Sequence, residues 1–155
     1  MITRLLLLLL ACAMLGLAGC KTTGKEGDQP ALTSIDVPQV PSDVLYLTIA
    51  HVMKQNGYDV GKSTVEEMMF EKQASTMQDL AYGGWGSGPA WSRVRIRTKQ
   101  LVDGGYRIDM TAGWVRDRGS KSMEEEKPVT KLGGGPFRSI LKEIRDKVSE
   151  STKAN

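Results

Sequence analysis

Two neighbouring stretches of the sequence alternate between apolar and polar residues, and this alternation limits the folds open to the chain. In residues 93–102 the inward members are Val94, Ile96, Thr98 and Val102, and in residues 106–116 they are Tyr106, Ile108, Met110, Ala112 and Trp114. A period of two residues is that of a β-strand with one buried face. Asp103-Gly104-Gly105 lies between the stretches and has the composition of a hairpin loop. The sequence therefore predicts an antiparallel hairpin.

The alternation also predicts how the two strands pair. If Val102 lies opposite Tyr106, then Ile96 lies opposite Ala112 and Val94 opposite Trp114 on the buried face. The same register places Lys99 opposite Asp109 on the exposed face, which is a favourable cross-strand pair. A slip of one residue would bury the arginines of the first strand, so we expect the faces to be firmly specified.

Two further segments have the period of an α-helix. Ser42 to Asn56 carries an apolar stripe, with Ser42 as the expected N-cap, Asp43 in the first turn and Gly57 as the residue that ends the helix. Its stripe consists of Val44, Leu45, Thr48, Ile49, Val52 and Met53. A second helix is expected to begin at Pro136, with the stripe Phe137, Ile140, Leu141, Ile144 and Val148.

The segments between these elements are less regular. Val65 to Gln73 has strand character, with Met68, Phe70 and Val65 facing inward, and helix is the alternative over residues 66–77. Residues 75–92 combine glycines with large aromatic residues and are expected to form a long loop. Residues 127–130 are expected to add a short edge strand.

The resulting fold class is α+β, in the order helix, strand, hairpin, helix. A small antiparallel sheet of three to four strands with both helices on one face would bury every apolar stripe. This layout resembles that of helix-grip-like domains in small envelope lipoproteins, a likeness of arrangement alone that names no function.

The N-terminus has the order of a secretory signal. One positive charge, Arg4, precedes six consecutive leucines, and small or apolar residues continue to Gly19. This run is shorter than the roughly 20 residues that a transmembrane helix needs. It ends in Leu17-Ala18-Gly19-Cys20, which resembles the lipobox of bacterial lipoproteins at all four positions. The alternative is an ordinary cleaved signal with an incidental cysteine.

The resemblance implies a defined maturation. Residues 1–19 would be removed, Cys20 would carry a diacylglyceryl thioether, and its new amine would be acylated, for instance with palmitate. Several acyl chains hold a protein at a membrane far longer than one chain does. Residues 20–41 are then the lipidated N-terminus and a flexible tether, 42–149 a single domain and 150–155 a disordered tail. Lys21 follows the cysteine where the family's inner-membrane proteins tend to have Asp. We therefore expect the periplasmic side of the outer membrane, or the outer face of the cytoplasmic membrane in a one-membrane organism.

Composition argues against several functions. The net charge of +3 falls to +2 once Arg4 is removed, which is too small to indicate nucleic-acid binding. Cys12 would leave with the signal and Cys20 would be acylated, so we expect neither a disulfide nor a metal cluster. The single histidine, His51, lies beside an apolar stripe, and we expect it to be partly buried and hydrogen-bonded. We expect the Glu124 to Glu126 run to be solvated, and we expect no catalytic site and no cofactor.

Two features remain as candidate contacts. Arg93, Arg95, Arg97 and Lys99 form a basic row on one strand face, with Arg107 beside them on the next strand. Such a row is either the solvated face of a half-exposed sheet or a contact for anionic lipid or an acidic partner. Trp85 and Trp91 lie in the aromatic loop, and the pattern leaves open whether they cover the core or face a partner. The hypothesis is a non-catalytic envelope lipoprotein that contacts a partner protein as an accessory or assembly subunit. The alternative is a lipid- or glycan-binding module.

Overall fold

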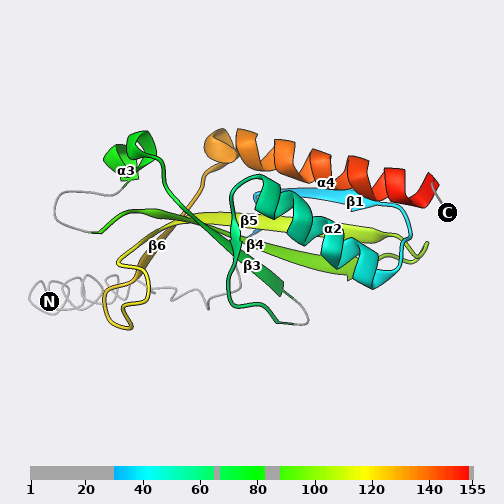
Figure 1. Ribbon diagram of the computed structural model, residues 1–155, viewed down its shortest axis with the longest axis horizontal. Helices are drawn as coiled ribbons and strands as arrows, with labels where there is room; N and C mark the ends of the chain where they lie inside the picture. The colour runs from blue at the N-terminus through cyan, green and yellow to red at the C-terminus, as the bar shows by residue number, and fades with distance from the viewer. Residues whose placement is uncertain (1–29, 65–66, 83–87, 154–155) are drawn as a thin grey trace, which may run out of the picture.

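The computed structural model describes residues 30–64, 67–82 and 88–153, which form one α+β domain (Figure 1). The α+β class predicted from the sequence is confirmed. In chain order the elements are β1 (Thr33–Val37), α2 (Ser42–Gln55), β2 (Asp59–Val60), β3 (Glu67–Gln73), α3 (Thr76–Tyr82), β4 (Trp91–Gln100), β5 (Tyr106–Arg116), β6 (Glu125–Pro128), the 3-10 helix η2 (Lys131–Gly134) and α4 (Gly135–Lys153).

The strands form an antiparallel sheet in the order β1-β5-β4-β3-β2. β6 also pairs with β5, so β1 and β6 share one edge of that strand: β1 pairs with residues 106–110 and β6 with residues 113–116. The described residues thus contribute six strands, where three to four were expected, and a third helix, α3. The segment 67–73 is strand and not helix.

The predicted hairpin forms, but its register differs by two residues. Ile96 pairs with Met110 and Val94 with Ala112, while Lys99 lies opposite Arg107. The strand ends at Gln100, so Val102 lies in a longer loop and is fully exposed. Leu101 N–H donates to the carbonyl of Gly105 at 2.8 Å, and Gly104 has φ +84°. A shift of two residues keeps each side chain on its face, so the predicted faces are confirmed for the residues within β4 and β5, and the prediction that Val102 faces inward is wrong.

One hydrophobic core lies between the sheet and the helices α2 and α4, which both pack on the same sheet face. We call this the helix face and the opposite one the outer face. The α4 stripe is buried as predicted, and so are the α2 residues Leu45, Ile49, Val52 and Met53. They meet a sheet layer of Phe70, Val94, Ile96, Ile108 and Met110. Met68 is partly buried against this core, whereas Val65 lies outside the described residues.

The domain begins earlier than predicted, because part of the expected tether is strand. Thr33, Ile35 and Val37 alternate with polar residues, and all three are β-branched side chains that favour strands. Ile35 pairs with Ile108 and Val37 is buried. The prediction of a flexible tether reaching Pro41 is therefore wrong for residues 33–37.

Three element ends also differ from the prediction. The N-cap of α2 is Pro41, and Ser42 is the first helical residue; Asp43 lies in the first turn as expected. The expected disordered tail is wrong for residues 150–153, since α4 continues to Lys153. There the hydroxyls of Ser151 and Thr152 donate to carbonyls of the preceding turn at 2.8–3.1 Å.

Residues 75–92 are not one loop, because α3 lies within them. Ser75 and Gln78 form a capping box: Ser75 N–H donates to Gln78 Oε1 at 3.0 Å, and Gln78 N–H donates to Ser75 Oγ at 3.5 Å. The Ser-x-x-Gln spacing in the sequence is typical of such a capping box. β4 then begins at Trp91, two residues earlier than expected.

The core residues can be tested with a matched pair of substitutions. Ile108→Ala removes a fully buried side chain and is expected to lower the free energy of unfolding by about 2–5 kcal/mol. Val102→Ala, in the exposed hairpin loop, is expected to change it by less than about 0.5 kcal/mol. Urea denaturation of both variants measures the difference, and equal losses would contradict the two-residue register reported above.

Candidate functional site

A cleft of about 520 Å³ opens on the helix face, where α2 ends and α4 begins. α3 stands at one end of the molecule, beyond the start of α4 (Figure 1). The cleft is bounded by the loop after α2, the end of β3, α3, and the first turns of α4. A second, more open hollow of about 380 Å³ continues along α4, and Ser139 and Glu143 line both.

Three aromatic side chains, those of Tyr58, Trp114 and Phe137, line the cleft. Tyr58, Phe137 and the sheet residue Ser92 are buried, and Trp114 of β5 is partly exposed. The hydroxyls of Tyr58 and Ser92 lie 3.2 Å apart and share a hydrogen bond. Burial raises the pKa of the Tyr58 phenol, and the hydrogen bond with Ser92 opposes this only in part. The phenol therefore stays neutral, and the cleft has an aromatic floor with a fixed hydroxyl pair.

Polar side chains on the wall of the cleft are held by one another. Lys72 Nζ donates to the carbonyl of Asn56 at 2.9 Å and lies 5.6 Å from the centre of the Tyr58 ring. The amide of Asn56 donates to Glu143 Oε2 at 3.1 Å and to the carbonyl of Val52 at 2.9 Å. These bonds connect β3, the end of α2 and α4, so the cleft keeps its shape without a bound molecule.

The end of α2 explains why Tyr58 reaches this floor. Gly57 has φ +80°, the left-handed conformation that glycine adopts at little cost, as the sequence predicted. Its N–H donates to the carbonyl of Lys54 at 2.9 Å, and Tyr58 N–H donates to that of Met53 at 3.0 Å. The chain therefore turns back beneath α2, and the next side chain enters the core.

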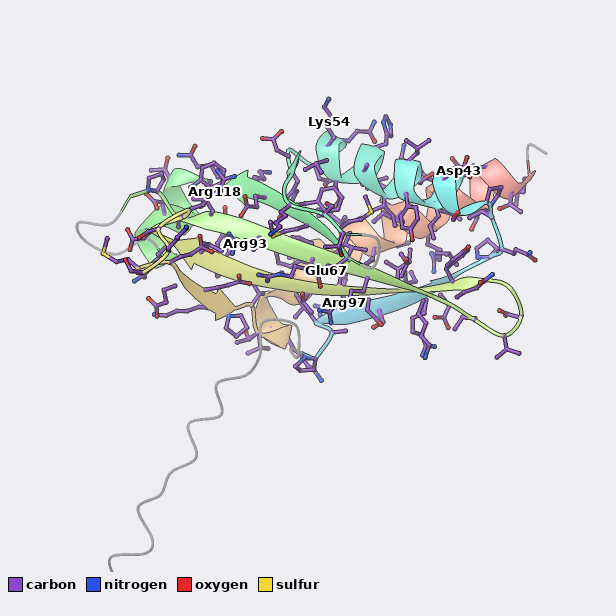
Figure 2. The ribbon with its side chains drawn as sticks, turned by 90° about the horizontal axis from the view of Figure 1, so that it is seen from below. Asp43, Lys54, Glu67, Arg93, Arg97 and Arg118 are labelled. Atoms are coloured by element: carbon purple, nitrogen blue, oxygen red, sulfur yellow. The ribbon has the colours of Figure 1, made fainter. Side chains whose placement is uncertain are left out.

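The predicted basic row lies on the outer face, but it is not a free cationic surface. Figure 2 shows Arg93, Glu67 and Arg97 together on this face, with Arg118 near its end. Carboxylates from β3, β6 and the loop before β6 contact the arginines of β4. Interpreting the row as a solvated face is wrong at Arg93, which is buried.

Arg93 is the most enclosed member of the row. Its guanidinium contacts Glu71 at 2.7 Å, Glu124 at 2.6 Å and Glu126 at 3.1 Å, and the side chains of Arg93 and Glu71 are only 8% and 5% exposed. Burial alone lowers the pKa of Arg93, but the hydrogen bonds with Glu124 and Glu71 outweigh it and the pKa rises. Gly113 lies opposite Arg93 on β5, and a Cβ there would collide with the Glu126 carboxylate.

The other cations of the row become more exposed toward the hairpin. Arg95 forms an ion pair with Glu126, whose hydrogen bond raises the pKa of Arg95, and Arg97 bonds Glu67 at 2.7 Å. Lys99 is exposed. Arg107 makes an exposed pair with Asp36 of β1 at 2.8 Å, and the hydrogen bond from Arg107 lowers the pKa of Asp36. The structure thus brings the five predicted cations onto one face but gives four of them carboxylate partners.

The tryptophans divide between the two faces of the sheet. Trp91 lies on the outer face, where the guanidinium of Arg118 stacks 4.0 Å from its ring centre while also bonding Glu71. Trp114, which the hairpin pattern placed on the buried side, lines the cleft instead of being fully buried. The prediction for Trp85 falls outside the described residues.

Two further expectations are wrong. His51 is exposed on α2, because it lies between the buried positions Ile49 and Val52 in sequence but on the side of the helix away from the core. The Glu124 to Glu126 run is not uniformly solvated, since Glu124 and Glu126 bind arginines of β4 while Glu125 remains exposed. Sequence spacing gave no sign of these pairs, because their partners lie 31 or more residues away.

Within residues 30–64, 67–82 and 88–153, no group of three or more His, Cys, Asp or Glu side chains is placed to hold a metal ion. No helix in the same ranges is long and apolar enough to cross a membrane. Comparison of the chain with protein-family models, with curated proteins and with solved structures finds no match.

The cleft was not predicted from the sequence. Its walls come from the ends of several elements, and no periodic pattern marks element ends. The available signals were local: the Asn-Gly pair that ends α2, the capping box of α3, and the Gly-Gly-Gly-Pro run at residues 133–136 before α4. Each marks an end, but only the fold shows that these ends meet.

The Arg93 cluster predicts a specific response to acid. Hydrogen bonding with Arg93 lowers the pKa of Glu124, so its contribution to stability is present above the ordinary glutamate pKa of about 4.3 and is lost as pH falls through the lowered value. Glu124→Gln is expected to lower the free energy of unfolding by about 1–3 kcal/mol at neutral pH and to lose less below pH 4 than the parent chain does. Urea titrations across this range measure both, with Glu125→Gln as the control that keeps the parent's profile. A Glu124→Gln chain with the parent's acid profile would contradict the assignment.

Proposed function

We propose that this chain is a lipid-anchored lipoprotein of the bacterial envelope whose folded domain binds a partner without catalysing a reaction. The observation that carries the binding role is the cleft between α2, α3 and α4. Its volume of about 520 Å³ lies within the range of specific binding sites, about 300–1,000 Å³. An aromatic floor with a few fixed polar groups is also typical of such sites.

The anchor is supported by the sequence before the domain. Arg4, the leucine run and Leu17-Ala18-Gly19-Cys20 together have the order of a lipoprotein signal. Lys21 after the cysteine favours the periplasmic side of the outer membrane. The strand β1 begins at Thr33, so residues 21–32 separate it from Cys20 and span at most about 40 Å when fully extended. The cleft then works close to a membrane surface, as expected of an accessory or assembly subunit.

The alternative function was binding of lipid or of glycan, and the two are not equally well supported. Contact with anionic lipid through the basic row has less support, since Arg93 and Arg95 already bind carboxylates of the same chain. The exposed cations at the hairpin end remain as its candidate contacts: Lys99, and Arg107 in its exposed pair with Asp36. Glycan binding, by contrast, does not depend on the basic row and can be assigned to the cleft.

The anchor is tested at the cysteine itself. Cys20→Ala is expected to abolish incorporation of labelled palmitate in a bacterial host and to leave the precursor uncleaved, because the acylated sulfur is gone. Cys12→Ala is the matched control and is expected to incorporate palmitate like the parent chain. Gel mobility and autoradiography measure both, and full labelling of Cys20→Ala would contradict the proposal.

The binding role is tested by a photo-crosslinker placed in the cleft. Benzoylphenylalanine at Ser139, an exposed residue that lines the cleft, is expected to give a discrete adduct when the full chain is irradiated in its host cells. The same crosslinker at Leu47, exposed on α2 and away from the cleft, is expected to give none. Immunoblots of the two chains measure this. Absence of an adduct at Ser139, or equal adducts at both positions, would overturn the cleft as binding site.

A further inference from the structure

We propose that the cleft binds an uncharged saccharide, and specifically a segment of an envelope glycan chain. This inference rests on the proposed binding role of the cleft and names the chemistry of its occupant. It follows from three properties of the lining: a partly exposed tryptophan beside buried aromatic residues, a balanced pair of charges, and polar groups that both donate and accept.

The floor offers aromatic surface beside water. Trp114 is partly exposed, and Tyr58 and Phe137 lie in the same floor with their rings against the core. Tryptophan and tyrosine are favoured where a surface is apolar on one side and wet on the other. A pyranose ring has this mixed character, since one face presents C–H groups and its rim presents hydroxyls. The aromatic floor therefore suits a sugar ring better than it suits a fully apolar chain.

The charge of the lining argues against an anionic ligand. Among the described residues that line the cleft, Lys72 and Glu143 carry charges of opposite sign. Each is engaged within the protein: Lys72 donates to the carbonyl of Asn56, and Glu143 accepts from the amide of that residue. A phosphate or carboxylate would find no excess of cations here. A neutral ligand is the better match.

The remaining polar groups suit hydroxyls. Gln78 of α3 accepts bonds from Ser75 through its Oε1 at 3.0 and 3.1 Å, which orients the amide and leaves its NH2 on the other side. Ser139 on α4 adds an exposed hydroxyl that can donate or accept, whereas the buried hydroxyls of Tyr58 and Ser92 are bonded to each other. A sugar hydroxyl is likewise donor and acceptor, so these groups can be satisfied together.

The shape indicates a chain and not a single ring. The second hollow of about 380 Å³ continues from the cleft along α4 and shares Ser139 and Glu143 with it. A monosaccharide would occupy the aromatic floor alone. An oligosaccharide can extend from the floor into the second hollow, where its hydroxyls meet Ser139 and charged side chains of both signs on α4, which are Lys142, Glu143, Asp146, Lys147 and Glu150.

The test is calorimetric titration of the full-length chain, purified in detergent, with three tetrasaccharides. The neutral probes are the β-1,4-linked tetramer of N-acetylglucosamine and maltotetraose, and the anionic probe is tetragalacturonate. At least one neutral probe is expected to bind at least tenfold more tightly than tetragalacturonate. Preference for the anionic probe, or binding of neither neutral probe, would overturn the proposal.

Variants locate the binding in the cleft. Trp114→Ala is expected to weaken binding of the neutral probe at least tenfold, whereas Trp91→Ala, on the opposite sheet face, is expected to leave it within twofold. A second variant, Ser139→Arg, places a large side chain at the exposed mouth of the cleft and is needed should Trp114→Ala fail to fold. It is also expected to weaken binding at least tenfold. Its matched control is Leu47→Arg on α2. Unchanged binding by a folded cleft variant would overturn the proposal.

The same experiments separate failure of this inference from failure of the binding role. Hydrolysis of the Ser139 photo-adduct distinguishes the occupants: an adduct that releases free sugars on acid hydrolysis supports a saccharide. An adduct that releases no sugar but yields a foreign peptide on proteolysis overturns the saccharide while leaving the binding role intact. Absence of any adduct overturns both.

Discussion

The ion pairs of the Arg93 guanidinium hold together the segments on the outer face of the sheet. It meets carboxylates from β3, from β6 and from the loop before β6, so one side chain joins three segments that are distant in sequence. A buried ion pair is stabilising only when its geometry and hydrogen bonds offset the loss of hydration. Here three carboxylates share the cation, and removing any one partner leaves charge in a place that water reaches poorly.

This cluster also fixes the cleft on the other side of the sheet. Ser92 and Arg93 are consecutive on β4, so their side chains point to opposite faces. The ion pairs hold the strand from the outer face, while Ser92 holds the hydroxyl of Tyr58 on the helix face. Across β5 the same division places Gly113 beneath Glu126 and Trp114 in the cleft. The charged network and the aromatic floor are thus formed by alternating residues of the same two strands, on opposite faces of the sheet.

The sequence predicted features that depend on periodicity and missed those that depend on distant partners. The faces of β4 and β5 and the buried stripe of α4 follow from periods of two and 3.6 residues, which are local properties. The register was wrong by two residues because Val102 lies in the loop, where its apolar side chain no longer reports pairing. The basic row was placed on the correct face. Its neutralisation was missed because the carboxylates of Glu71 and Glu126 lie 22 and 33 residues from Arg93. Apolar and polar residues also alternate in β1, but Pro30 and Pro38 lie on either side of it and made the segment resemble a linker.

The shared edge of β5 has a mechanical consequence. β1 is the first described element of the domain and is attached to β5 by five residue pairs, with Ser34 and Asp36 adding side-chain bonds to that strand. Any tension applied through the N-terminus reaches this short ladder before it reaches the helices or the cleft. β6 occupies the remainder of the same edge and lies outside this direct path, because it follows β5 in the chain. A domain built this way can yield at β1 while β3, β4, β5 and β6, and the Arg93 cluster between them, keep their arrangement.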